Sequence, residues 1–238
     1  MAITGLKKYK YKYDLHVHTS PVSTCADLSP EQTVKLYAEA GFSGFVLTNH
    51  FNLGVMGTHT AKKDFAEYYL NDYYKAKEAG KKEGLDISPG MEIRFPENTN
   101  DYLVYGISED DVYRAAEYLE SDYKTFYREF KSDHNIIIQA HPLRNSCVLC
   151  DLDYVDGIEV FNMHPNHNSR ISLAAKLVKE NSRLLITGGT DFHHDGHQGL
   201  CAVCTGKRLK TSYDVADIIS SGDFIFDLSG NKIIPAQL

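Results

Sequence analysis

Residues 14–18 read DLHVH, with two histidines one residue apart behind an aspartate. The surrounding segment YKYDLHV (11–17) predicts a β-strand. Because side chains at positions i and i+2 of a strand share a face, His16 and His18 would stand side by side at the strand end. Their Cα atoms would lie about 6–7 Å apart, which suits two ligands of one metal ion. The alternative is a pair of ordinary surface histidines, so the rest of the chain must decide.

Composition limits the possible classes of protein. The 238 residues suit one large α/β domain or two small ones, and 42% hydrophobic residues suffice for a full core. A net charge of −7 without a basic block argues against long nucleic acid as a partner. We see no signal peptide and no apolar run of membrane-spanning length, and the five cysteines are odd in number. We therefore expect a cytoplasmic protein without disulfides or a membrane partner.

Short apolar runs alternate with helical stretches along the chain. We expect strands at 11–17, 44–48, 85–95, 101–107, 136–140, 157–161, 184–189, 200–204 and 224–228, and helices at 29–41, 62–84, 109–121, 123–133, 169–181 and near 212–220. Such alternation is typical of parallel strands joined by crossover helices, in a barrel or a doubly wound sheet. In these folds, chemistry collects at the C-terminal ends of the strands.

Side chains of the metal-binding types fall at the ends of these predicted strands. They are His16, His18, His50, Glu92, Asp101, His141, Asp191 and His193, and only Asp101 stands at the start of its strand. If the strands are parallel, these groups meet at one mouth. Mixed nitrogen and carboxylate donors suit Zn²⁺, Mn²⁺ or Fe²⁺, and their number implies two or three ions with Glu92 as a bridge. The alternative is that each residue is an ordinary polar loop residue.

The motifs DLHVHTS, TNH, GME, AHP and GGTDFHH occur in this order from residue 14, and the match extends to about residue 228. They resemble the motifs of the PHP (polymerase and histidinol phosphatase) superfamily. The resemblance implies a distorted (β/α)7 barrel, which we expect as a single domain over residues 1–238. It also implies a di- or trinuclear metal centre and hydrolysis of phosphate esters, most of all monoesters, by a metal-bound hydroxide.

The resemblance gives each candidate ligand a place. It implies a first metal held by His16, His18, Glu92 and Asp191, a second held by His141 and bridged by Glu92, and a third held by His50 and His193.

Two positions depart from the family's pattern. Asp101 stands where many members have a histidine, and a carboxylate there favours harder ions such as Mn²⁺ or Mg²⁺. Many members also have an aspartate or histidine a few residues after the histidine pair, where this chain offers only Cys25 and Asp27. We take Asp27 as the candidate ligand; without one, the third site would be weak or lost.

Four further residues receive roles as hypotheses. Arg144, three residues after His141, would clamp phosphate oxygens unless it is a surface arginine. His164 would face the mouth and contact substrate, or else lie in solvent. His193 would protonate the leaving group if the third metal is absent. Asp14 would orient the histidine pair by accepting a ring N–H.

The function with most support is a metal-dependent hydrolase of a small phosphorylated substrate. Two other classes stay open: a metal-dependent hydrolase of C–N or C–O bonds on a related barrel, and a non-catalytic metal-binding PHP module. The sequence indicates neither the particular ester nor the oligomeric state.

Overall fold

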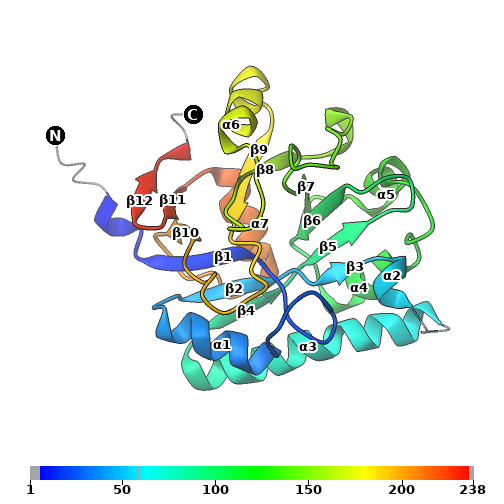
Figure 1. Cartoon of the computed structure of the whole chain (residues 1–238), viewed down its shortest axis with the longest axis horizontal. Coiled ribbons are helices and arrows are strands. Elements are labelled where there is room, and N and C mark those ends of the chain that lie inside the picture. Colours follow the sequence, from blue (N-terminus) through cyan, green and yellow to red (C-terminus); the bar gives the residue numbers. More distant parts are fainter. Residues whose placement is uncertain (1–5, 58, 60, 236–238) are drawn as a thin grey trace.

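The computed structural model describes residues 6–57, 59 and 61–235, whose strands form two six-stranded sheets with helices on their outer sides (Figure 1). The first sheet has the order β12-β11-β10-β1-β2-β4, and the second has the order β3-β5-β6-β7-β8-β9. The strands are β1 (Tyr11–Val17), β2 (Gly44–Leu47), β3 (His50–Phe51), β4 (Asp86–Pro89), β5 (Met91–Arg94), β6 (Asp101–Tyr105), β7 (Ile136–Gln139), β8 (Gly157–Asn162), β9 (Leu185–Gly189), β10 (Cys201–Thr205), β11 (Phe224–Leu228) and β12 (Asn231–Ile233).

The two sheets are joined into a distorted barrel. Strand β2 continues into β3 after two residues, and β4 continues into β5 after Gly90 alone, so each pair crosses from one sheet to the other. On the opposite side, the N–H of His18 donates to the carbonyl of Phe192 (3.0 Å) and the N–H of Phe192 donates to the carbonyl of His16 (3.1 Å), which brings the end of β9 to β1. Within the described residues, β1, β2–β3, β4–β5, β6, β7, β8 and β9 thus form a ring. The predicted distorted (β/α)7 barrel is confirmed.

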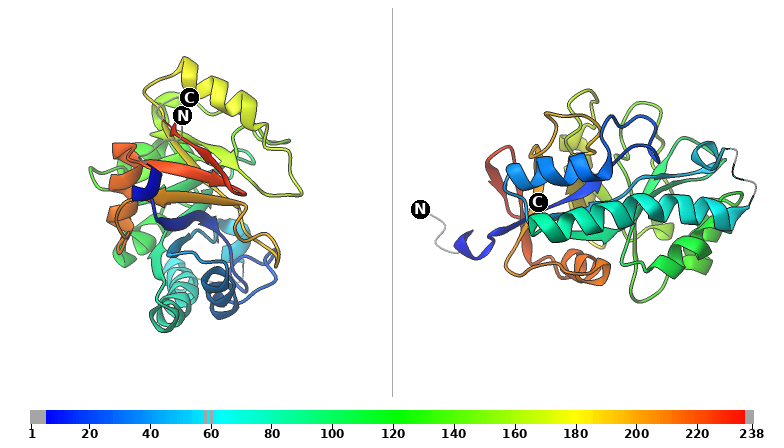
Figure 2. Two further views of the ribbon diagram at one scale, coloured as in Figure 1. Left: turned by 90° about the vertical axis from the view of Figure 1, so that its left-hand side faces the viewer. Right: turned by 90° about the horizontal axis from the view of Figure 1, so that it is seen from below.

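The helices are α1 (Pro30–Glu39), α2 (Leu53–Met56), α3 (Lys62–Glu83), α4 (Glu109–Ala116), α5 (Tyr123–Phe130), α6 (Ile171–Glu180) and α7 (Ser212–Ser221), with short 3₁₀ helices at Leu6–Lys8 and Leu152–Tyr154. A reciprocal capping box of Ser29 and Gln32 starts α1, and Gly84 in a left-handed conformation ends α3. These two helices pack side by side under the first sheet (Figure 2). The helix expected at 109–121 stops at Ala116, where turns replace it.

The expectation of parallel strands is only partly correct. Strands β1, β2 and β4 are parallel, as are β7, β8 and β9, but β6 runs antiparallel to both β5 and β7. The reversal matters for the site, because Asp101 at the start of β6 pairs with Arg94 at the end of β5. Asp101, which stands at the start of its strand rather than at the end, therefore lies at the same edge as the other candidate ligands.

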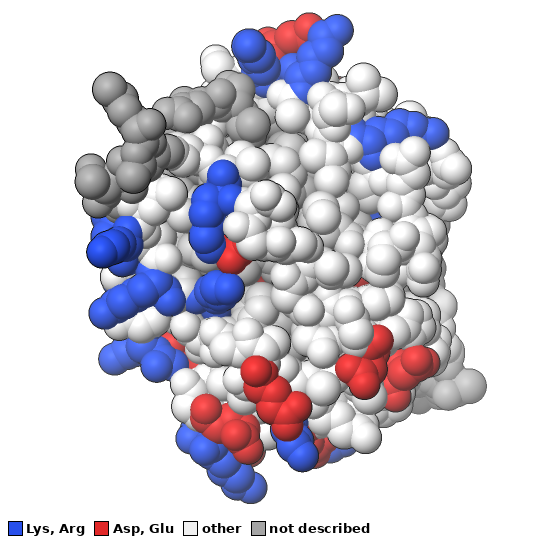
Figure 3. All heavy atoms as spheres, turned by 60° about the vertical axis from the view of Figure 1, so that its left-hand side comes forward, with Lys and Arg blue, Asp and Glu red and all other residues white. Residues whose placement is uncertain are grey.

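The outside of the molecule carries charges of both signs. On the face shown in Figure 3, basic and acidic side chains lie next to one another in small groups, with uncharged surface between the groups. None of the helices in the described part of the chain is both long and apolar enough to cross a bilayer.

Gly189 permits the close approach of β9 to β1 beneath the histidine pair. An added Cβ would come within 2.8 Å of the backbone nitrogen of His16 and closer still to its side chain. Because His16 belongs to a buried strand, neither its backbone nor its side chain has room to move aside.

We therefore expect Gly189→Ala to lower the free energy of unfolding by about 1–3 kcal/mol, the usual cost of overpacking a core. Urea denaturation would measure the change. Gly206→Ala is the matched control, since a Cβ there meets nothing nearer than the carbonyl oxygen of Lys8 at 3.6 Å. Equal stability of the two variants would contradict this account of Gly189.

Candidate metal centre

The carboxylate of Glu92 on β5 lies among four imidazoles. Its Oε1 is 3.2 Å from His16 Nε2 and 3.1 Å from His141 Nε2, and its Oε2 is 3.4 Å from His18 Nε2 and 2.7 Å from His50 Nδ1. Burial favours the neutral carboxyl, but His16 and His50 hold the pKa of Glu92 well below its usual range. An ionised carboxylate with ring nitrogens on both oxygens has the arrangement of a bridging ligand.

Asp191 lies on the other side of the histidine pair. Its Oδ1 is 3.4 Å from Nε2 of both His16 and His18, and its Oδ2 accepts hydrogen bonds from Arg144 (2.7 Å) and Asn162 (3.2 Å). Burial opposes its charge, yet His16, His18 and Arg144 keep the pKa of Asp191 well below the ordinary value. The structure thus brings the proposed ligands of the first and second metals together at one edge of the barrel.

Two of these ligands have unusual backbone conformations. The φ angle is 57° at Asp191 and 29° at His141. Asp191 lies two residues after the end of β9, and His141 lies two residues after the end of β7. Positive φ is uncommon outside glycine, although Asp and His adopt it more readily than most residues. Such conformations cost of order 1–3 kcal/mol and cluster at functional sites. Here they turn His141 toward Glu92 and Asp191 toward the pair His16 and His18.

The donor atoms form three groups that are each tight enough to surround an ion. Within each group, one ligand atom per residue lies within 4.8 Å of the others; the groups are His16–His18–Asp191, His50–Glu92–Asp101 and His18–His50–His193. His16 Nε2, His18 Nε2, His50 Nδ1 and Glu92 Oε2 are buried without a hydrogen-bond partner. Because orphaned buried polar atoms are rare, these residues fit a centre in which cations satisfy them.

The histidines are turned so that the orphaned nitrogens face the centre. His16 Nδ1 lies 2.8 Å from Glu159 Oε1, and His18 Nδ1 lies 3.0 Å from the hydroxyl of Ser23. His193 Nδ1 lies 2.9 Å from the carbonyl oxygen of Asp191. An Nδ1–H that donates to oxygen leaves the lone pair on Nε2, which is the form that a metal ligand needs.

Glu159 on β8 is a residue that sequence reasoning missed. One oxygen contacts the ring of His16, and the other accepts the backbone N–H of His141 (2.9 Å) and the amide of Asn162 (2.9 Å). The prediction that Asp14 orients the histidine pair through a ring N–H is wrong, because its carboxylate accepts the backbone N–H of His16 (3.1 Å) instead. A glutamate inside the apolar run GIEVF was the available signal, since an isolated charge in a buried strand requires a partner.

Arg94 is a second residue that the sequence did not single out. Its guanidinium donates two hydrogen bonds to Asp101, at 2.7 and 2.6 Å, while Asp101 Oδ2 lies 3.8 Å from His141 Nε2. Burial and the negative charge of Glu92 raise the pKa of Asp101, and the Arg94 guanidinium opposes that rise. Asp101 is therefore placed to serve the second metal, with Arg94 fixing its plane.

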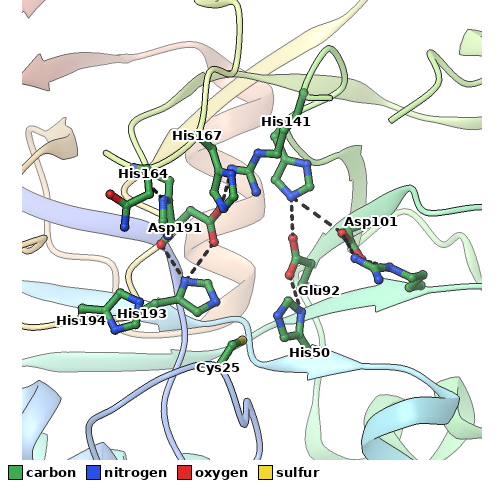
Figure 4. Close-up of a pocket in the computed structure, with 13 residues that line it drawn as sticks. Cys25, His50, Glu92, Asp101, His141, His164, His167, Asp191, His193 and His194 are labelled. Carbon is green, nitrogen blue, oxygen red and sulfur yellow. Dashed lines mark hydrogen bonds and ion pairs between the residues drawn. The ribbon is translucent and has the colours of Figure 1, made fainter. Parts of the chain in front are cut away.

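The structure does not bring Asp27 to this centre. Its exposed carboxylate lies 2.7 Å from His194 Nδ1, outside the three groups. The neighbouring Cys25 lies at the centre instead, beside His50 and His193 (Figure 4). Burial raises the pKa of the Cys25 thiol, but interactions with His193 and His50 outweigh it and bring the value to about 6.

A cavity of about 330 Å³ opens above these ligands. Figure 4 shows its lining, which includes the three residues predicted to act on substrate, Arg144, His164 and His193. Arg144 Nε is buried without a hydrogen-bond partner. Burial lowers the pKa of His164 to about 4, so its ring is neutral near pH 7.

Comparison with known proteins identifies the family of the chain. The sequence profile of the PHP domain matches residues 14–228. No curated protein matches the chain.

Two solved structures share the fold. One is a two-domain protein from Bacteroides vulgatus ATCC 8482 containing a predicted PHP-like metal-dependent phosphoesterase; it is 18% identical with a TM-score of 0.65, and the match covers 92% of this chain and 64% of that one. The other is PsfC from Pseudomonas syringae PB-5123, 15% identical with a TM-score of 0.64, with coverage of 86% and 87%. The chain thus spans less than two thirds of the first protein, and at these identities the likeness concerns the fold alone.

We expect Glu159→Gln to weaken metal binding by about 10–100-fold, because the amide no longer offers His16 a charged acceptor. Competition with a chromogenic chelator would measure the affinity. Glu39→Gln is the control, since Glu39 is exposed at the end of α1. An unchanged affinity in the Glu159 variant would show that its contact with His16 has no part in holding metal.

Proposed function

Because the chain belongs to the PHP domain family, we propose that it is a metal-dependent phosphoesterase that hydrolyses a small phosphate monoester. The observation that carries the proposal is the ionised carboxylate of Glu92 between four imidazoles at the floor of an open cavity. A structural zinc site would be closed by four protein ligands, whereas this centre faces solvent-accessible space on one side.

The residues that would hold the metals are those of the three donor groups together with His141, whose Nε2 lies 3.1 Å from Glu92 Oε1. His16, His18 and Asp191 would hold the first ion, Asp101 and His141 the second, and Glu92 would lie between them. When bound, the ions would supply an activated water and positive charge for the phosphoryl oxygens. The donor set suits Mn²⁺, Zn²⁺ or Fe²⁺, because carboxylates favour Mn²⁺ and imidazoles suit Zn²⁺ and Fe²⁺.

Arg144 would bind the phosphoryl group. One of its terminal nitrogens donates to both Asp191 and Asn162 at 2.7 Å, which fixes the guanidinium at the cavity wall. The side chain lines the cavity, where its guanidinium would donate to a phosphate oxygen. A planar guanidinium held in this way neutralises charge that grows on the oxygens in the transition state.

His164 is suited to donate a hydrogen bond to the substrate. Its Nδ1 accepts the backbone N–H of Asn166 (3.2 Å), so the proton of the neutral ring is on Nε2. His193 is less suited to be the general acid, because its Nδ1–H is used by the carbonyl of Asp191 and its other nitrogen belongs to a donor group. We therefore assign to His164 a hydrogen bond from its Nε2–H to the leaving oxygen, which would take its proton from solvent water, and we assign metal binding to His193.

The substrate is expected to be small. A cavity of about 330 Å³ is at the lower end of the range for ligand sites. The net charge of −7 disfavours a long polyanion, so long nucleic acid is not proposed as a substrate.

We expect the protein with added Mn²⁺, Zn²⁺ or Fe²⁺ to release phosphate from an aryl phosphate and from small monoesters. His16→Ala should lower both metal content and turnover, the latter by at least about 100-fold, since even residues behind the ligands cost 10–100-fold. Elemental analysis and phosphate release are the measurements. Turnover of amides or lactones but not of phosphates would favour a C–N or C–O hydrolase, and metal binding without any turnover would favour a non-catalytic module.

We also expect Arg144→Ala to lower kcat by about 10²–10³-fold on phosphate monoesters, as loss of one transition-state donor does. Arg144→Lys should recover little, because a lysine ammonium cannot form the same planar fork of donors. Arg183→Ala is the control, since Arg183 is exposed and pairs with exposed Asp153. Steady-state kinetics with unchanged kcat in Arg144→Ala would contradict the assignment.

A further inference from the structure

One of the three donor groups contains no carboxylate. His18, His50 and His193 each direct a ring nitrogen into a space where these atoms lie within 4.8 Å of one another, whereas the other two groups include Asp191 or Glu92 with Asp101. His18 is fully buried, and its Nε2 has no hydrogen-bond partner. Three imidazoles bring no negative charge to offset that of a divalent ion, so an anionic ligand at this group would complete it.

Cys25 borders this group, because its side chain lines the same cavity as those of His50 and His193. Figure 4 shows its sulfur between His50 and His193, and its thiol interacts with both rings. The loop that carries it is tied to the site, since the backbone N–H of Asp27 donates to the carbonyl of His193 (3.0 Å). The side chain of Asp27 lies on the surface, beside His194.

We propose that the Cys25 thiolate is a ligand of the third metal, together with His50 and His193, and that it makes this position selective for zinc. Coordination replaces the S–H bond by a metal–sulfur bond, and the proton goes to solvent; no electron is transferred. Sulfur and imidazole donors favour Zn²⁺ over Mn²⁺ or Mg²⁺. The inference rests on the proposed metal centre, but it does not depend on which ester is hydrolysed.

The first test uses the reactivity of the thiol and needs no turnover. Cys25 is free and exposed, so iodoacetamide should alkylate it in the metal-free protein. In the zinc-loaded protein we expect alkylation at least about tenfold slower, because a coordinated thiolate is a weaker nucleophile. Peptide mass spectrometry gives the rate at this residue. Equal rates with and without zinc would overturn the proposal.

The second test uses spectroscopy and stoichiometry. Cobalt-loaded wild type should show a near-ultraviolet thiolate-to-cobalt charge-transfer band that Cys25→Ser lacks. Cys147→Ser is the matched control, because Cys147 is the other accessible thiol near the centre, 3.6 Å from His141 Nδ1. Loss of the band in the Cys147 variant with retention in the Cys25 variant would contradict the assignment.

Zinc content separates this inference from the proposed function. Cys25→Ser should lose one equivalent of zinc relative to wild type and keep the others, and Cys25→Asp should restore the ion without the charge-transfer band. Circular dichroism would check that both variants fold. If wild type and Cys25→Ser hold equal zinc, the inference fails and the metal centre stands. If wild type holds no zinc, manganese or iron, both fail.

Discussion

The structure depends on one electrostatic constraint, which is that an ionised glutamate is kept in the interior. Glu92 is 1% exposed, and a carboxylate in such a place is unstable unless opposite charge or hydrogen-bond donors surround it. Four imidazoles from three different segments supply that surrounding. Because Glu159 and Asp191 raise the pKa of His16 against the effect of burial, each charge in the cluster supports another. Such a network has little reason to exist in a protein that does not bind cations there.

Two distortions of the barrel bring these residues to one edge: the crossing of a segment from one sheet to the other, and the reversed direction of β6. Gly90 alone separates β4 from β5, so one continuous segment leaves the first sheet and delivers Glu92 to the second. The antiparallel β6 brings Asp101 to the same edge, and the left-handed turn at Asp191 points its carboxylate toward the histidine pair. A regular parallel barrel would have placed Asp101 at the opposite end.

The sequence predicted where most strands lie along the chain and most of the side chains that meet at one edge, because period-2 runs and short motifs carry local information. It predicted His16 and His18 as neighbours for this reason. It did not predict the direction of β6, since apolar runs of four to eight residues look the same in either orientation. It also missed Glu159 and Arg94, and it misassigned the contact of Asp14. These roles depend on which strands are adjacent, and long-range pairing of that kind is not visible in local patterns.

The two sides of the centre differ in the hardness of their donors. On one side, Arg94 fixes the carboxylate of Asp101 beside His141, an oxygen-rich environment suited to Mn²⁺. On the other, His50 and His193 flank the thiol of Cys25, a nitrogen and sulfur environment suited to Zn²⁺. Glu92 touches both sides through its two oxygens, reaching His141 with Oε1 and His50 with Oε2. A shared carboxylate between unlike sets of donors favours a centre that holds two kinds of metal rather than several copies of one.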